Sequence, residues 1–208
     1  MRIALFGGTF DPPHRGHIAI ARAAADRFAL DEVLFAPTGR QPLKVEHAAA
    51  FNDRLAMTTL ACADDPRFKP SAIDAPLSGG TPNYTVDTLY TLLDSMPGTD
   101  VLFNLVGADS FHSIARWRNP RHLLQLAEWI VVSRPGFPLA EPPGFVLTPA
   151  ERTRIHLLDS IHEDVAATDL RERLAAGDPC ADLLSVPVST YIRQHHLYLA
   201  DGSLCPVP

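Results

Sequence analysis

The chain has 208 residues and a formal net charge of −6, with 24 acidic side chains against 18 lysines and arginines. A general nucleic-acid binder would be basic, so this charge argues against a nucleic acid as partner. The length suits one α/β domain spanning 1–208, and no apolar run approaches the roughly 20 residues of a membrane span.

The three cysteines, Cys62, Cys180 and Cys205, are far apart and form no C-x-x-C pattern. Neither a zinc site nor a disulfide framework is therefore indicated, which suits a reducing cytoplasm. Because Met1-Arg2 leads straight into an apolar run, no signal peptide is expected. We expect a cytoplasmic protein without membrane contact, and the sequence leaves assembly into a homo-oligomer open.

The first predicted element is a strand over residues 3–6, an apolar run that ends at Gly7 and Gly8. The chain must then turn, because Asp11-Pro12-Pro13 can neither extend a strand nor begin a regular helix at once. Helical spacing begins at His17 and continues to residue 28, with an apolar stripe that includes Ile18, Ala21 and Ala25.

Strands and helices alternate along the rest of the chain. Further strands are expected at 33–36, 68–74, 101–106, 128–133 and 155–158, and helices at 51–63, 85–95, 120–126, 166–176 and 186–197. The helix over 51–63 is expected to place Leu55, Thr59 and Cys62 on one side. The proline-rich segment 135–149 is interpreted as a surface connection within the domain. This order predicts an α/β fold of Rossmann-like type, an open parallel sheet with helices on both faces.

The turn after the first strand has the features of an anion site. It is neither a P-loop nor a G-x-G-x-x-G fingerprint, but it combines glycines with the N-terminus of a helix. His14 and His17 stand there three residues apart, so both imidazoles can face one point, as a polyphosphate would require. A metal site or a pair of surface histidines are the alternatives, although a helix N-terminus disfavours a cation.

The stretch GGTFDPPHRGH, residues 7–17, resembles the signature of the nucleotidylyltransferase superfamily, whose (H/T)xGH motif corresponds to His14-Arg15-Gly16-His17. Within it, GGTFDP followed by His14 is most similar to the bacterial nicotinate-nucleotide adenylyltransferases. A pantetheine-phosphate adenylyltransferase would usually show Thr-Asn-Gly-His in a shorter chain. The resemblance implies a fold of nucleotidylyltransferase type and transfer of the adenylyl group of ATP to nicotinate mononucleotide, giving nicotinate adenine dinucleotide and pyrophosphate in NAD biosynthesis.

The resemblance also implies an ATP site at the ends of the first and central strands. Gly107-Ala108-Asp109-Ser110 is similar to the family's Gly-x-Asp-Ser turn, although Asp109 could simply cap the next helix. Asp109 would contact the ribose or the magnesium. The ATP-binding residues implied are Gly7, Gly8, Thr9, Phe10, His14, His17, Gly107, Asp109, Thr168 and Arg171.

A second group of motifs implies a mononucleotide site. Tyr84-Thr85-Val86-Asp87-Thr88 resembles the family's Tyr-Thr-x-x-Thr segment; Thr85 could also cap the helix, whose N-terminus could bind the nicotinate carboxylate. Trp117 would stack on the nicotinate ring, although a tryptophan in such a stretch is usually core. Lys44 and Arg134 would reach phosphate oxygens, and Leu43 departs from the family's usual histidine. The mononucleotide-binding residues implied are Lys44, Tyr84, Thr85, Trp117 and Arg134.

Two C-terminal segments resemble the family's Ile-Ser-x-Thr-x-Ile-Arg motif. Ser189–Arg193 lies inside a predicted helix, whereas Thr168 and Arg171 lie where a helix begins after the last strand. We therefore assign the phosphate contacts to Thr168 and Arg171, with Ala166 departing from the family's serine.

Adenylyl transfer needs no protein nucleophile, because the acceptor phosphate is already ionised, so catalysis depends on positioning and charge stabilisation. The catalytic residues expected are His14, His17, Lys44 and Arg171. Mg²⁺ is expected as cofactor, held mainly by ATP and its own waters, so no metal cage is expected in the protein. Nicotinamide mononucleotide, pantetheine phosphate or a cytidylyltransferase substrate as acceptor, a metal-dependent hydrolase, and a nucleotide-binding regulator without chemistry remain the alternatives.

Overall fold

The computed structural model describes residues 1–42, 48–133, 141–159 and 166–199. Its strands are β1 (Arg2–Gly8), β2 (Glu32–Pro37), β3 (Phe68–Pro70), β4 (Val101–Gly107), β5 (Glu128–Val132) and β6 (Ile155–Leu158). Its α-helices are α1 (Arg15–Phe28), α2 (Phe51–Cys62), α3 (Thr85–Ser95), α4 (Ala108–His112), α5 (Pro120–Leu126), α6 (Pro149–Thr153), α7 (Ala167–Ala175) and α8 (Val186–Gln194). Two short 3₁₀ turns, Ser78–Gly80 and Ile114–Arg116, complete the described elements.

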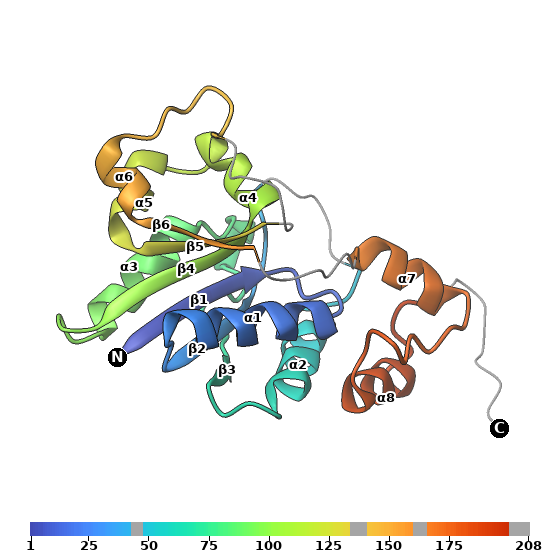
Figure 1. Cartoon of the computed structure of the whole chain (residues 1–208). Coiled ribbons are helices and arrows are strands. Elements are labelled where there is room, and N and C mark those ends of the chain that lie inside the picture. The colour runs from blue at the N-terminus through green and yellow to red at the C-terminus, as the bar shows by residue number, and fades with distance from the viewer. Residues whose placement is uncertain (43–47, 134–140, 160–165, 200–208) are drawn as a thin grey trace.

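All five strand pairings are parallel, and the strand order is β3-β2-β1-β4-β5-β6. This order confirms the Rossmann-like open parallel sheet (Figure 1). The order reverses between β1 and β4, whose carboxyl ends lead into the His14 turn and into Asp109. In such sheets the crevice at this reversal is where ligands bind, so the topology brings the two sequence motifs to one edge.

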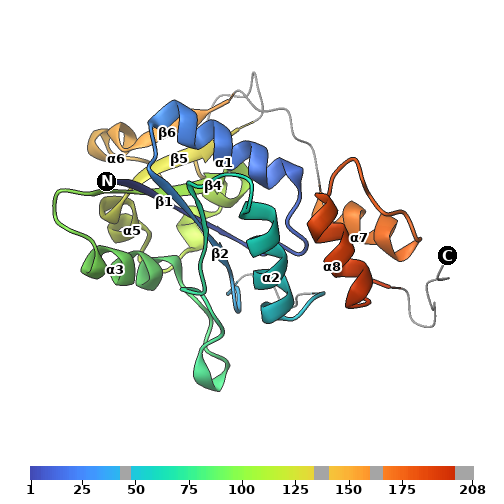
Figure 2. The ribbon, with the colours of Figure 1, turned by 90° about the horizontal axis from the view of Figure 1, so that it is seen from below.

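Alternating side chains of the strands enter two separate cores. On one face, Ala4 and Phe6 of β1 pack with Ala21 and Ala25 of α1. On the other, Leu5 packs with residues of α3, α4 and α5, among them Leu89, Phe111 and Leu123. Helices therefore cover both faces of the sheet (Figure 2), as a parallel sheet requires.

The two C-terminal helices form a third cluster at one end of the sheet, beyond α2 (Figures 1 and 2). Leu170 and Leu174 of α7 pack there with Val188 and Ile192 of α8 and with Met57 of α2. Since α2 also packs against the sheet through Cys62, this cluster ties α7 to the body that carries the β1–α1 turn.

Several predicted boundaries were wrong. The strand expected at 68–74 ends at Pro70, because the chain turns where Ala75 donates to the carbonyl of Ala72. The last helix ends at Gln194 and not at 197, because His196 adopts a left-handed φ of 52°. The first helix begins at Arg15, two residues earlier than expected, and a helix follows Gly107 directly.

The buried side of α2 also differs from the expected one. The structure buries Arg54, Thr58 and Cys62, whereas Thr59 is exposed. The reason is the guanidinium of Arg54, which bonds three buried carbonyl groups and so turns this side of the helix inward. No helix in the described part of the chain is long and apolar enough to cross a membrane.

Candidate active site

The turn between β1 and α1 holds the two signature histidines face to face. His14 is the N-cap of α1 and His17 lies in its first turn, and their ring centroids are 3.7 Å apart. Phe10 packs edge-on against His17 at 5.0 Å. The two imidazoles therefore lie side by side at the positive end of the helix dipole, and their approach to a common ligand stays a prediction.

Both imidazoles are neutral at physiological pH. Burial lowers the pKa of His14 to about 4. Burial, followed by the proximity of His14, lowers the pKa of His17 well below its usual value. The backbone N–H of His14 donates to Nδ1 of His17 at 3.2 Å, so the proton of the neutral His17 ring is on Nε2. His17 therefore offers an N–H donor to a ligand without carrying a charge itself.

The glycines and Phe10 of this turn have different surroundings. A Cβ added to Gly8 would lie 3.0 Å from the Phe10 ring, so a larger residue would require this ring to shift. Gly7 is exposed, and a Cβ added to it would meet no other atom within 4 Å. The side chain of Phe10 is fully buried, so only its backbone could contact the ATP that the sequence assigns to it.

Arg171, predicted from the C-terminal motif, lies against the turn. Its Nη1 donates to the backbone carbonyl of Asp11 at 2.8 Å, and its Nη2 donates to the hydroxyl of Thr168 at 3.3 Å. Arg171, and through it Thr168, is therefore joined to the β1–α1 turn, which lies about 160 positions earlier in the chain. Arg193 of the competing motif is exposed on α8.

Asp11 fixes the turn from the other side. Its carboxylate accepts hydrogen bonds from the backbone N–H groups of Ala48 and Ala49 and from the hydroxyl of Tyr198. Asp11 itself is 3% exposed. These contacts connect the turn to the segment before α2 and to the C-terminal end of the described chain, and sequence reasoning did not identify Tyr198.

Arg54 is the second residue that sequence reasoning missed. This arginine of α2 is 1% exposed and donates to three backbone carbonyls, those of Thr9 at 2.7 Å, Thr38 at 2.9 Å and Ala49 at 3.2 Å. Thr9 follows β1 and Thr38 follows β2, so one guanidinium holds the ends of two adjacent strands. An arginine on an otherwise mixed helix gives no sequence signal of this role.

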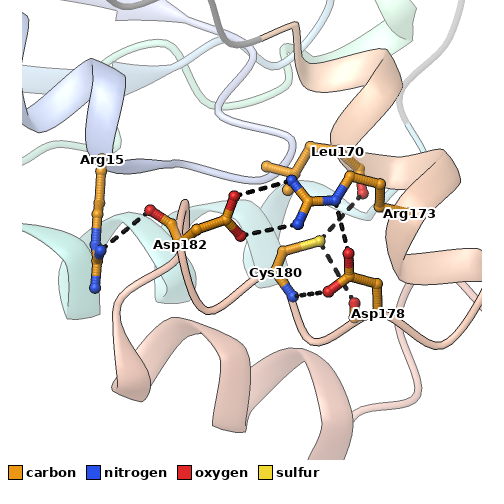
Figure 3. A network of polar contacts seen from close by, with 6 residues as sticks. All are labelled: Arg15, Leu170, Arg173, Asp178, Cys180 and Asp182. Atoms are coloured by element: carbon orange, nitrogen blue, oxygen red, sulfur yellow. Dashed lines mark hydrogen bonds and ion pairs between the residues drawn. The ribbon is translucent and has the colours of Figure 1, made fainter.

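A polar network holds α7 against α1 (Figure 3). Arg173 pairs with Asp178 and, through two nitrogens, with Asp182. The carbonyl of Asp182 accepts from Nη1 of Arg15 at 3.1 Å, and the carbonyl of Leu183 accepts from the Arg15 backbone N–H at 2.8 Å. Arg15 lies between the two signature histidines in sequence, so this network positions Arg171 relative to them.

A cavity of about 450 Å³ opens on the α3 side of the sheet, at the reversal point between β1 and β4. Its lining combines predicted and unpredicted residues: Gly7, Tyr84, Thr85, Asp109 and Trp117 from the predicted sites, and Thr38, Asp74, Asn83 and Asn104 among the others. The structure thus brings together the predicted mononucleotide residues of two segments that lie about 30 positions apart.

Trp117 serves both the core and the cavity. Its ring lies 6.1 Å from that of the fully buried Trp129, and its Nε1 donates to the hydroxyl of Ser113 at 3.0 Å. The remaining surface of the ring lines the cavity. The two interpretations weighed from the sequence, core residue and stacking platform, are therefore compatible.

The N-terminus of α3 also borders the cavity. Its N-cap is Tyr84, so the expectation that Thr85 caps the helix was wrong: Thr85 is the first helical residue, and no side chain caps this end. Uncapped N–H groups of a first turn need another acceptor. The guanidinium of Arg118 lies 4.7 Å from the Tyr84 ring centroid, which orients this aromatic side chain at the rim.

The described residues hold no group of three or more His, Cys, Asp or Glu side chains that could bind a metal ion. Asp109, exposed in the first turn of α4 and lining the cavity, is a carboxylate that could accept a hydrogen bond from a magnesium-bound water. Lys44 and Arg134, both predicted to contact phosphate, lie outside the described residues.

The chain is similar to known proteins over most of its length. The family model described as cytidylyltransferase-like matches residues 5–173. A protein of Herpetosiphon aurantiacus named "Probable nicotinate-nucleotide adenylyltransferase" is 41% identical over 96% of this chain and 99% of its own length. One of the same name from Roseiflexus is 42% identical over 94% and 97%.

Among solved structures, the nicotinic acid mononucleotide adenylyltransferase of Plasmodium falciparum complexed with NaAD superposes with a TM-score of 0.72. It is 16% identical, and the superposition covers 95% of this chain and 97% of that one. At this identity the likeness concerns the fold, and it agrees with the strand order derived above.

Proposed function

Because this chain belongs to the cytidylyltransferase-like family, and within it to the nicotinate-nucleotide adenylyltransferases, we propose that it transfers the adenylyl group of ATP to nicotinate mononucleotide. The products are nicotinate adenine dinucleotide and pyrophosphate, and the reaction belongs to NAD biosynthesis. The observation that carries the proposal is the pair of neutral histidines at the N-terminus of α1, at the sheet edge that also holds the cavity.

The phosphate of the mononucleotide attacks the α-phosphorus of ATP in line, and the bond to pyrophosphate breaks. Holding the two reactants in this geometry can supply about 7–11 kcal/mol of the barrier. Nε2–H of His17 donates to phosphate oxygens of ATP at the N-terminus of α1, where a neutral donor and the positive end of the helix dipole stabilise anionic charge. His14 lies against the same ring and takes part in the same phosphate site.

Arg171 stabilises the charge that develops on the α-phosphate or on the leaving pyrophosphate. Two of its nitrogens bond Asp11 and Thr168, so the guanidinium is oriented before ATP binds. Lys44 is proposed for the same phosphates and Arg134 for the phosphate of the mononucleotide, on the family resemblance alone. Trp117 stacks on the nicotinate ring inside the cavity, and Tyr84 and Thr85 border that ring.

Mg²⁺ bound with ATP would supply charge neutralisation at the phosphate oxygens. Asp109 is the residue that we propose to hold one of its waters, in keeping with an ion that binds through ATP. We further propose a cytoplasmic location, supported by the two described cysteines, Cys62 and Cys180, which are both free thiols. Assembly into a homo-oligomer stays a proposal from the sequence.

The purified chain, incubated with ATP, Mg²⁺ and nicotinate mononucleotide, should form nicotinate adenine dinucleotide, identified by mass spectrometry. A matched reaction without acceptor should leave ATP intact, which separates transfer from hydrolysis. ATP consumption at the same rate without acceptor would contradict the proposal and favour a hydrolase. ATP binding without any product would favour a nucleotide-binding regulator.

A further inference from the structure

A buried asparagine, Asn104, lies at the floor of the cavity. Asn104 lies in the middle of β4, between Leu5 of β1 and Trp129 of β5 in register, and is 2% exposed. Its Nδ2 has no hydrogen-bond partner among the described residues, although its side chain lines the cavity. An unsatisfied donor in a core is costly, so such a group is expected to meet a ligand.

The surroundings of Asn104 are otherwise apolar on its own sheet face. Leu5 and Val106 of the adjacent strand positions and Leu123 of α5 line the cavity beside it. Asn104 therefore interrupts a continuous apolar surface of the sheet. A leucine at this position would stabilise the core at least as well. Stability alone therefore gives no reason for an asparagine at this position.

A second donor group borders the same cavity. The helix α3 has 11 residues and no side-chain cap, and Thr85 and Val86 of its first turn line the cavity. The N–H groups of these first two helical residues have no acceptor within the helix, and they lie at the positive end of its dipole. The indole Nε1 of Trp117 is already bonded to Ser113, so the ring offers its face and not a donor.

We propose that Nδ2 of Asn104 donates a hydrogen bond to the carboxylate of nicotinate mononucleotide and helps the cavity to select the acid over the amide. This inference rests on the proposed function and assigns a specificity-determining residue to it. A carboxylate presents two charged acceptor oxygens, whereas a carboxamide presents one neutral acceptor and an NH₂ that needs an acceptor of its own.

Two carboxyl groups of the described residues line the cavity, those of Asp74 and Asp109. Asp74 is buried, and its carboxylate accepts a hydrogen bond from the hydroxyl of Thr88. Burial raises the pKa of Asp74 above its usual value, while the bond from Thr88 acts in the opposite direction. Burial therefore favours the neutral form of Asp74, which would not repel a bound carboxylate.

The test compares two substitutions, Asn104→Leu and Asn104→Asp, with nicotinate and nicotinamide mononucleotide as acceptors. Asn104→Leu removes the donor at similar volume, and we expect kcat/KM for the acid to fall about 10-fold or more, the loss typical of a charge-assisted hydrogen bond. The amide should change much less. Asn104→Asp sets an acceptor against the carboxylate, so the acid should lose about 100-fold while the amide is retained or improved.

Ser185→Ala is the matched control. It removes another buried polar group without a partner among the described residues, but Ser185 precedes α8 and does not line the cavity. The acid-to-amide ratio should stay at the wild-type value in this variant, and the KM for ATP should stay unchanged in all three. An acid-to-amide ratio that is the same in wild type and both Asn104 variants would overturn the proposal.

The two proposals fail in different ways. If the wild type makes the dinucleotide and the Asn104 variants keep its ratio, only the role of Asn104 is wrong. If the wild type transfers no adenylyl group, the function is wrong, and calorimetry with nicotinate mononucleotide alone still tests Asn104. Wild-type affinity for that ligand in Asn104→Leu would then reject the inference, and a loss of about 10-fold or more would support it.

Discussion

Replacing Arg54 by methionine should destabilise the protein strongly, because its buried guanidinium holds three backbone carbonyls. Methionine fills the volume of the arginine stem but leaves the carbonyls of Thr9, Thr38 and Ala49 without their donor. Hydrogen bonds to a charged group contribute about 1.5–3 kcal/mol each. Three bonds at the lower end of that range give a loss of about 4–5 kcal/mol in the free energy of unfolding.

For a chain of this length each kcal/mol shifts Tm by roughly 2–4 °C, so Arg54→Met should melt roughly 8–20 °C below the wild type. Thermal and urea unfolding measure this loss, and Arg193→Met, which changes an exposed arginine of α8, serves as the control. Because the ends of β1 and β2 lose a common anchor, kcat measured well below Tm should fall roughly 10- to 100-fold. A Tm within 2 °C of the wild type would refute the reasoning, since about 1 kcal/mol or less would then depend on these bonds.

Four other substitutions or conditions test the site. His17→Ala should lower kcat much more than it raises KM, because its Nε2–H acts on the phosphates; an unchanged kcat in steady-state assays would reject the role. Trp117→Ala should weaken binding of the mononucleotide more than that of ATP in calorimetry, and equal weakening would contradict stacking. Arg171→Ala should reduce turnover while Arg193→Ala leaves it nearly intact, and the reverse would favour the other copy of the motif. The pKa of His14 is about 4 in the folded chain and about 6.5 in the unfolded chain, so the unfolded state binds more protons between these pH values. Stability to urea should therefore fall as the pH drops from 6.5 towards 4, and it should fall less in His14→Asn. An equal fall in both proteins would argue against a buried neutral ring at this position.

The sequence predicts most of the architecture because the strands of a parallel sheet are buried on both faces. Continuous apolar runs at residues 3–6, 101–106 and 128–133 are readable as such. The prediction extended β3 too far, because the end of this strand is set by its pairing with β2 and not by a pattern in its own sequence. The turn between β1 and α1 and the proximity of its two histidines were predictable because they are contained in one contiguous motif.

The contacts that hold that turn were not readable. Two residues that hold the turn, Arg54 and Tyr198, are separated from their partners by long stretches of chain. The same is true of Asn104 and the other residues that line the cavity. Each of the three is an ordinary polar residue in its own segment. An arginine on a helix predicts an exposed side chain, and only the fold shows that this one reaches three backbone carbonyls. Long-range polar contacts of this kind have no periodicity from which they could be predicted.

The central claim is tested most directly by pyrophosphate release from ATP and Mg²⁺ with nicotinate mononucleotide, nicotinamide mononucleotide or phosphopantetheine as acceptor. The site predicts rapid release with nicotinate mononucleotide and little with the other two. Equal release with the amide would keep the reaction class but contradict carboxylate recognition by the cavity. No release with any acceptor, together with measurable ATP binding, would contradict adenylyl transfer itself.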